Sequence, residues 1–294
     1  MRDSALILTA VAATTLLAGN ADAYPPGGDP IREIGRTTEK EINVVLTSSF
    51  GSVAVGRGEK EKMLVAETKN AETKDPMMGV NYNIRNRIGY LDIALGEGCS
   101  DENRSKGTFA VNSLRGGTWD LKFSDAVPIS FDVELGVGSG DFDLTGLKVK
   151  DFNLHTGASD VTLDFDTPNE ASIDNITVES GVSKFSGRNL NNANFKHFQF
   201  QGGVGSYELD FGGDLRGEVD VDIDLGFGFL TIIVPKSTGA RVFYEKNWVS
   251  RLDCDRDFGN AAENQYVTDN FYTAGGKMNI RINSGLGSIR IRHR

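Results

Sequence analysis

The residues best suited to chemistry are four carboxylates at every second position of one segment, Glu218, Asp220, Asp222 and Asp224. On a strand, this spacing puts all four side chains on one outward face, with successive ones about 7 Å apart. Such a pair could bridge a hard cation such as Ca²⁺ or act as an acid and a base. Equivalent places in neighbouring segments carry other polar side chains and no second carboxylate row. We therefore interpret the four as a solvated sheet face and predict neither a metal site nor a cofactor.

Other patterns that often indicate catalysis are missing from the chain. The three histidines, His155, His197 and His293, lack the spacing of metal ligands, and no nucleophile-elbow pattern is present. The glycine-rich stretch 136–140 runs into another strand-like segment, whereas a dinucleotide fingerprint opens a helix. The sequence thus predicts a protein that is not an enzyme.

Two cysteines, Cys99 and Cys254, are the only ones in the chain. In an oxidising compartment, an even number of cysteines favours a disulfide. Two unpaired, buried thiols are the alternative. We predict a Cys99–Cys254 bridge.

Composition and the N-terminus indicate an exported chain with few classes of partner. The formal net charge of −10 disfavours nucleic acid and anionic lipid as partners, because both are polyanions. Residues 1–23 have the apolar stretch and the Ala21-Asp22-Ala23 cleavage pattern of a signal peptide. An uncleaved N-terminal anchor is the alternative. No second long apolar run follows, so we expect a mature chain without a transmembrane segment that is secreted, periplasmic or on the cell surface.

The elements that would position any site come from an internal repeat. Tight corners begin at Gly136, Gly157, Gly181, Gly203 and Gly226, in steps of 21, 24, 22 and 23 residues. The third corner position is small in nine units, which suits a crowded bend. These corner residues are Gly51, Gly89, Gly117, Gly138, Ser159, Ser183, Gly205, Gly228 and Gly287.

Apolar residues alternate with polar ones on both sides of most corners, as in half-buried strands. Each unit is therefore predicted to be strand, corner, strand, and one unit cannot bury its inward face without stacked neighbours. The sequence predicts an all-β protein with a single β-solenoid of about 22 residues per rung over residues 41–294. A polar leader precedes it at 24–40, and an aromatic insertion interrupts it at about 240–275.

One segment departs from strict alternation. Phe229–Val234 is almost continuously apolar, which is typical of a strand covered on both faces. We expect a bulge there and predict that residues 240–275 fold over this rung, with Trp248 and Phe258 in contact. The alternative is that Phe229, Ile233 and Trp248 stay exposed and form a partner-binding face.

Several segments resemble the toast-rack family of bacterial envelope β-solenoids. That group includes the C-terminal domain of LiaF-type antibiotic-response proteins and the domains known as "putative adhesin". The resemblance covers roughly 125–242 and Ser284–Ile291. Its segments are Glu134–Leu144, Thr156–Leu163, Glu179–Val182, Gly226–Gly228, Val234–Lys236 and Gly239–Val242.

The resemblance implies a sheet-rich module that binds a ligand or partner outside the cytoplasm. We predict an exported, non-catalytic binding or scaffolding module at the cell envelope, either adhesin-like or linked to the envelope-stress response. Its partner would be a protein or glycan, and self-association is a further option. A β-helical enzyme acting on polysaccharides is the alternative, because such enzymes share a period near 22.

Overall fold

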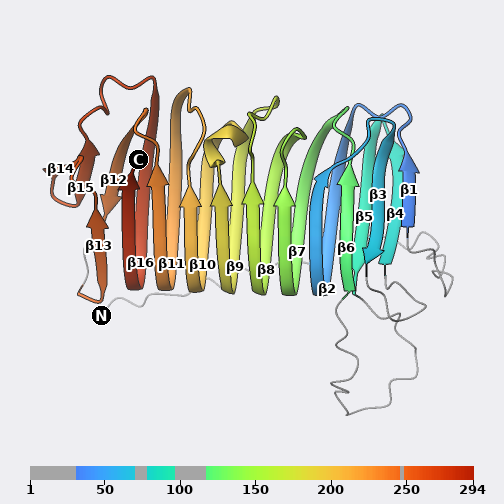
Figure 1. Cartoon of the computed structure of the whole chain (residues 1–294), viewed down its shortest axis with the longest axis horizontal. Coiled ribbons are helices and arrows are strands. Elements are labelled where there is room, and N and C mark those ends of the chain that lie inside the picture. The colour runs from blue at the N-terminus through green and yellow to red at the C-terminus, as the bar shows by residue number, and fades with distance from the viewer. Residues whose placement is uncertain (1–30, 70–77, 97–116, 246–247) are drawn as a thin grey trace, which may run out of the picture.

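The computed structural model describes residues 31–69, 78–96, 117–245 and 248–294 (Figure 1). In this part of the chain the structure is built from β-strands and one short 3-10 helix, Leu190–Ala193, so the predicted all-β class is confirmed. The strands are β1 (Ile31–Gly35), β2 (Glu41–Arg57), β3 (Lys62–Lys69), β4 (Met78–Arg85), β5 (Ile88–Leu95), β6 (Gly117–Phe123), β7 (Pro128–Asp143), β8 (Lys148–Asp164), β9 (Ile173–Arg188), β10 (Phe195–Asp210), β11 (Gly217–Val234), β12 (Thr238–Tyr244), β13 (Ser250–Cys254), β14 (Phe258–Ala262), β15 (Gln265–Thr268) and β16 (Gly276–His293).

Each central rung is one long strand that bends in the middle, where the sequence predicts two strands and a corner. In β10, Phe198 and Phe200 are buried before the bend, and Tyr207 and Leu209 are buried after it. The inward side therefore changes from even to odd positions across the bend. This change lets both halves of the strand face the same core.

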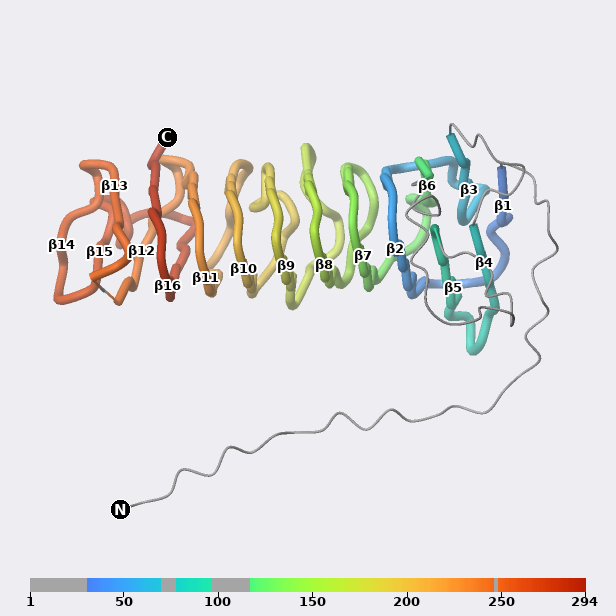
Figure 2. The backbone as a smooth tube through the Cα atoms, turned by 90° about the horizontal axis from the view of Figure 1, so that it is seen from below, coloured from blue at the N-terminus to red at the C-terminus, as the bar shows by residue number. Residues whose placement is uncertain are grey.

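The rungs stack as parallel strands in the order β2, β7, β8, β9, β10, β11 and β16 (Figures 1 and 2). Like residues lie over like, so the core forms columns. Phe131 lies in register with Phe152 on the next rung, at 6.3 Å between ring centroids, and it also packs edge to face against Phe123 of β6. The predicted β-solenoid is confirmed, and the stack provides a rigid frame with outward side chains at regular spacing.

The small corner residues form one column because the bends of successive rungs touch. Gly138 pairs with Gly51 and Ser159, and the column continues through Ser183 to Gly287. A Cβ on Gly138 would lie 1.8 Å from the Gly51 carbonyl oxygen, which leaves no room for a side chain. Eight of the nine predicted corner residues lie in this column, Gly117 through its pairing with Gly51.

Gly89 is the exception, and its assignment as a corner residue is wrong. It lies in β5 and pairs with Ile42, well before the bend of β2. β4 and β5 form an antiparallel hairpin whose two turn residues, Asn86 and Arg87, both have positive φ, as in a type I′ turn. Apolar and polar residues alternate on both sides of this turn, as they do on both sides of a corner, so the sequence pattern of the hairpin resembles that of a rung.

Both ends of the stack are threaded out of sequence order. β2 lies between β7 and the pair β5 and β6, and β16 lies between β11 and the pair β12 and β13. Figure 2 shows these terminal strands outside β2 at one end and outside β16 at the other. The leader predicted at 24–40 is in part a strand, because β1 pairs antiparallel with β3.

The aromatic insertion caps the end of the stack and does not cover β11. β12 and β13 pair with β16, and β15 and β14 extend the sheet beyond β12. β11 alternates strictly after its bend, with Leu230, Ile232 and Val234 buried, so the predicted bulge is absent. Trp248 is 95% exposed, so its predicted contact with this rung is wrong.

Candidate binding groove

A groove of about 730 Å³ runs along the stack on one side of the bend. Six side chains from successive rungs form its polar wall, and they pair in register from β7 to β16. At the usual strand spacing, five steps between six rungs give a length of about 24 Å. The wall residues are Glu134, His155, Glu179, Gln201, Asp224 and Asn283.

Glycines form the groove floor two positions after each wall residue. Gly203 stacks on Gly181, and a Cβ on Gly203 would lie 2.5 Å from the Gly181 carbonyl oxygen. Gly136 and Gly157 make the same close approach. Because no side chain fits at these positions, the wall side chains stand beside an open trough.

Buried hydroxyl groups lie directly beneath the groove. Thr156 and Ser180 point inward between the wall and the floor, and their oxygens are 3.2 Å apart. Ser180 also contacts the Ser183 hydroxyl in the same bend. These contacts satisfy polar groups inside an otherwise apolar core and hold the bends of β8 and β9 together.

An exposed apolar column follows the groove floor by one residue. The sequence repeat already has apolar residues at this position, and the structure turns them outward. Val182 is 63% exposed, and Phe227 is 48% exposed. The column consists of Val137, Ala158, Val182, Val204, Phe227 and Leu286.

The sequence contains a signal for the wall in the position of its residues, although their side-chain types alone would not identify them. Each of the six wall residues stands two positions before a corner glycine and carries a hydrogen-bonding side chain. Asp224 is one of the four carboxylates, and His155, Glu179 and Gln201 hold polar positions at the equivalent places of neighbouring segments. What the sequence could not show is that glycines open a trough beside them.

A comparison with protein families matches residues 29–187 to the N-terminal domain of toast-rack proteins, also called DUF2154. The match covers more than half of the 294 residues. The chain belongs to the toast-rack family. The resemblance inferred from the sequence is thereby confirmed, and the match also includes β1 to β6, which precede the segments that carried it.

Two solved structures are similar to this toast-rack chain. A "putative cell adhesion protein" from Clostridium sporogenes is 18% identical, with a TM-score of 0.44, and the match covers 90% of this chain and 98% of that one. A "putative adhesin" from Bacteroides fragilis is 13% identical, with a TM-score of 0.36, and the match covers 89% and 95%. At these sequence identities and TM-scores, the names of the two proteins do not transfer to this chain. No curated protein matches its sequence.

The wall of this toast-rack groove does not assemble a catalytic triad. His155 Nδ1 lies 3.1 Å from Glu179 Oε2, and both side chains point outward. Ser180 is the neighbouring hydroxyl, but it follows Glu179 directly and so points to the opposite side of the strand. The imidazole therefore has no nucleophile beside it among the described groove residues.

The four carboxylates of β11 lie outward as predicted and are occupied by side chains of β16. Asn279 donates to Glu218 at 2.8 Å, and Arg281 pairs with Asp222 at 3.0 Å. Asp220 faces His197 and Arg281, and Asp224 accepts from Asn283. In the described residues no group of three or more His, Cys, Asp or Glu is placed to hold a metal.

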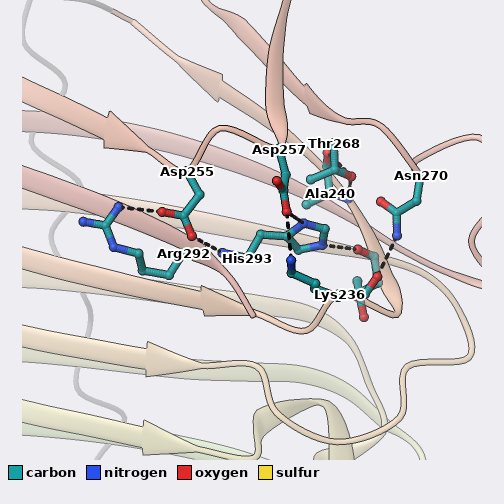
Figure 3. Close-up of polar contacts among 9 residues, drawn as sticks. Lys236, Ala240, Asp255, Asp257, Thr268, Asn270, Arg292 and His293 are labelled. Carbon is teal, nitrogen blue, oxygen red and sulfur yellow. Dashed lines mark hydrogen bonds and ion pairs between the residues drawn. The ribbon is translucent and has the colours of Figure 1, made fainter.

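His293 belongs to a polar latch at the C-terminal end of the stack (Figure 3). Its Nδ1 lies 3.2 Å from Asp257 Oδ2, and its Nε2 lies 3.3 Å from the Thr238 carbonyl oxygen. Asp257 also pairs with Lys236 at 3.5 Å, and Asp255 accepts from the His293 backbone. The latch fastens β16 to the cap, which gives this histidine a structural role.

The predicted partner face is exposed but dispersed. Phe229 is 67% exposed on β11, and Ile233 is half-buried on the same face. Trp248 stands immediately before β13, two strands away in the stack. Phe258 is buried and packs against the His293 ring at 5.8 Å, so it does not contact the β11 rung. These residues stay an alternative to the groove.

The predicted disulfide falls partly outside the described residues, because Cys99 lies there. Leu95, at the end of β5, is eight strands from Cys254 in β13, which is about 38 Å at the usual strand spacing. Four residues span at most about 14 Å, and bridged cysteines have Cα atoms within about 7 Å. The described strands therefore favour reduced thiols or a link between two chains over a bridge within one chain.

Cys254 itself should react slowly with alkylating reagents. Burial, together with Asp253 and Asp255, raises the pKa of its thiol to about 12. At pH 8 the thiolate fraction, and with it the rate of iodoacetamide labelling, should be roughly a thousandfold below that of an ordinary cysteine. A Cys99→Ser variant isolates this thiol, and mass spectrometry follows its labelling. Labelling at the rate of free cysteine would contradict the raised pKa of this half-buried thiol.

Proposed function

We propose that this toast-rack chain is an exported, non-catalytic binding or scaffolding module of the bacterial cell envelope, and that its ligand lies along the groove. The observation that carries the proposal is the in-register wall of six hydrogen-bonding side chains beside an open floor of glycine. Every groove-lining strand from β7 to β16 is paired on both sides, so the frame is rigid. A rigid frame with outward polar groups binds without the entropic cost of ordering a loop.

The localisation is consistent with what the chain shows. Its acidic surface and predicted signal peptide suit export. In the described residues no helix has the length and apolarity to cross a membrane. Wall carboxylates at Glu134, Glu179 and Asp224 disfavour anionic ligands, because like charges repel.

The test is co-sedimentation of the purified mature chain with isolated bacterial envelopes. Gln201→Arg places a long side chain in the groove, and Gln199→Arg makes the same change two residues earlier on the same outward face of β10. We expect the wild type and Gln199→Arg to sediment equally and the bound fraction of Gln201→Arg to fall about tenfold. Equal sedimentation of both variants, or no sedimentation of the wild type, would remove the groove as the binding site.

The enzymatic alternative has its own assay. A polysaccharide-degrading β-helix needs carboxylates arranged for acid and base catalysis. We expect no depolymerisation of polyuronides, with or without Ca²⁺. Turnover that Glu179→Gln abolishes would establish catalysis in place of simple binding.

A further inference from the structure

The shape of the groove requires a linear ligand. Its volume of about 730 Å³ would suit a small molecule if it were compact. It is instead spread over six rungs and open along its length, with the long axis perpendicular to the strands. A ligand that fills it is a polymer lying along the stack.

The spacing of the wall distinguishes between polymers. Wall side chains recur once per rung, at about 4.8 Å. Side chains on one face of an extended peptide recur at about 6.7 Å, so a peptide loses register within a few rungs. The repeat of an extended pyranose chain is close to one rung, so successive sugars meet equivalent side chains.

The sheet at the groove has no free edge for a peptide strand. A peptide that adds a strand needs a free sheet edge, and a polyproline segment needs an aromatic-lined groove. The lining strands are paired on both sides, and none of the lining residues is Phe, Tyr or Trp. The wall side chains are therefore the groups best placed to recognise a ligand.

The side chains suit hydroxyl groups without acidic substituents. Carboxylates and amides, such as Glu134, Gln201 and Asn283, accept from or donate to sugar hydroxyls. Three carboxylates in the wall repel uronates and phosphates. The exposed apolar residues that follow the floor, such as Val182 and Phe227, offer a surface to the C–H faces of sugar rings.

We propose that the ligand of the groove is a glycan chain free of acidic groups, lying along the stack with about one sugar per rung. This inference rests on the proposed function and names the ligand class of the same groove. It assigns hydrogen bonding to the six wall residues and apolar contact to the column beside the floor.

The test uses envelope polysaccharide, freed of protein by protease and split by anion exchange into acidic and non-acidic fractions. Calorimetry with the full mature chain should show binding of the non-acidic fraction and none of the acidic fraction. Oligosaccharides cut from the bound fraction should gain affinity with length up to about six sugars and then level off. Gln201→Ala should weaken binding about tenfold, and Gln199→Ala should not.

Each contrary outcome has one meaning. If intact envelopes bind the chain but neither fraction does, and protease removes the envelope binding, the ligand is a protein and the glycan proposal is overturned. Preferred binding of the acidic fraction, or affinity that stops rising at two sugars, overturns it as well. If intact envelopes do not bind at all, the proposed function itself fails.

Discussion

Valine in place of Gly205 is expected to lower the free energy of unfolding by about 3 kcal/mol. A Cβ at this position would lie 1.8 Å from the Ser183 carbonyl oxygen and 2.9 Å from the Tyr207 ring. The backbone oxygen belongs to the rung below and cannot move without opening the stack. The strain therefore falls on the contact between two rungs.

The matched control is Val204→Ala on the same strand. Val204 is 44% exposed and belongs to the outward apolar column, so its truncation should change stability by less than about 0.5 kcal/mol. Urea unfolding followed by circular dichroism measures both variants. Unchanged stability of Gly205→Val would show that successive bends are not in contact there.

Alanine in place of Asn169 should have an effect of similar size, about 3 kcal/mol. The side chain is buried and links three parts of the chain. Its Oδ1 accepts from the Val149 backbone at 3.0 Å, and its Nδ2 donates to the carbonyl oxygens of Val149, Ala171 and Ala193. Truncation leaves the buried N–H and C=O of Val149 without these partners, and each costs about 1–3 kcal/mol.

Asn175→Ala is the control for this variant, because Asn175 is an exposed amide on β9. Its loss should be close to neutral in the same urea titration. An Asn169→Ala variant as stable as the Asn175 control would mean that water replaces the buried amide without cost.

Alternation and corner spacing were enough to predict the rungs, because inward residues and bends recur at fixed offsets. Gly140 and Gly187 interrupt the inward apolar column, and the structure shows why this is tolerated. Phe142 and Leu190 occupy the space that side chains at these glycines would fill. A neighbouring side chain can thus fill the space of a missing inward one. The sequence pattern does not show this, because it compares only equivalent positions of the rungs.

The ends of the stack could not be predicted, because sequence order does not determine which strand lies inside which. β2 and β16 are inserted between rungs that precede or follow them in the chain. The aromatic insertion at about 240–275 is therefore a cap outside β16, where we expected a cover over β11. The nearly continuous apolar run Phe229–Val234 predicted a strand covered on both faces, yet Phe229 is exposed to solvent.

The groove was visible in the sequence only as a polar position before each corner glycine. Its depth comes from the close stacking of Gly136, Gly157, Gly181 and Gly203, which spacing does not show. The difference matters for function, since the same six side chains on a flat sheet would be a solvated face.

Hydroxyl-radical footprinting of the chain bound to envelopes tests the groove most directly, since it reports the solvent exposure of side chains. His155 in the wall and Phe227 in the column beside the floor should lose labelling on binding. Trp248, which is 95% exposed at the end of the stack, should be labelled equally in both states. Protection of Trp248 and Phe229 with His155 still labelled would contradict the groove and assign binding to the alternative face.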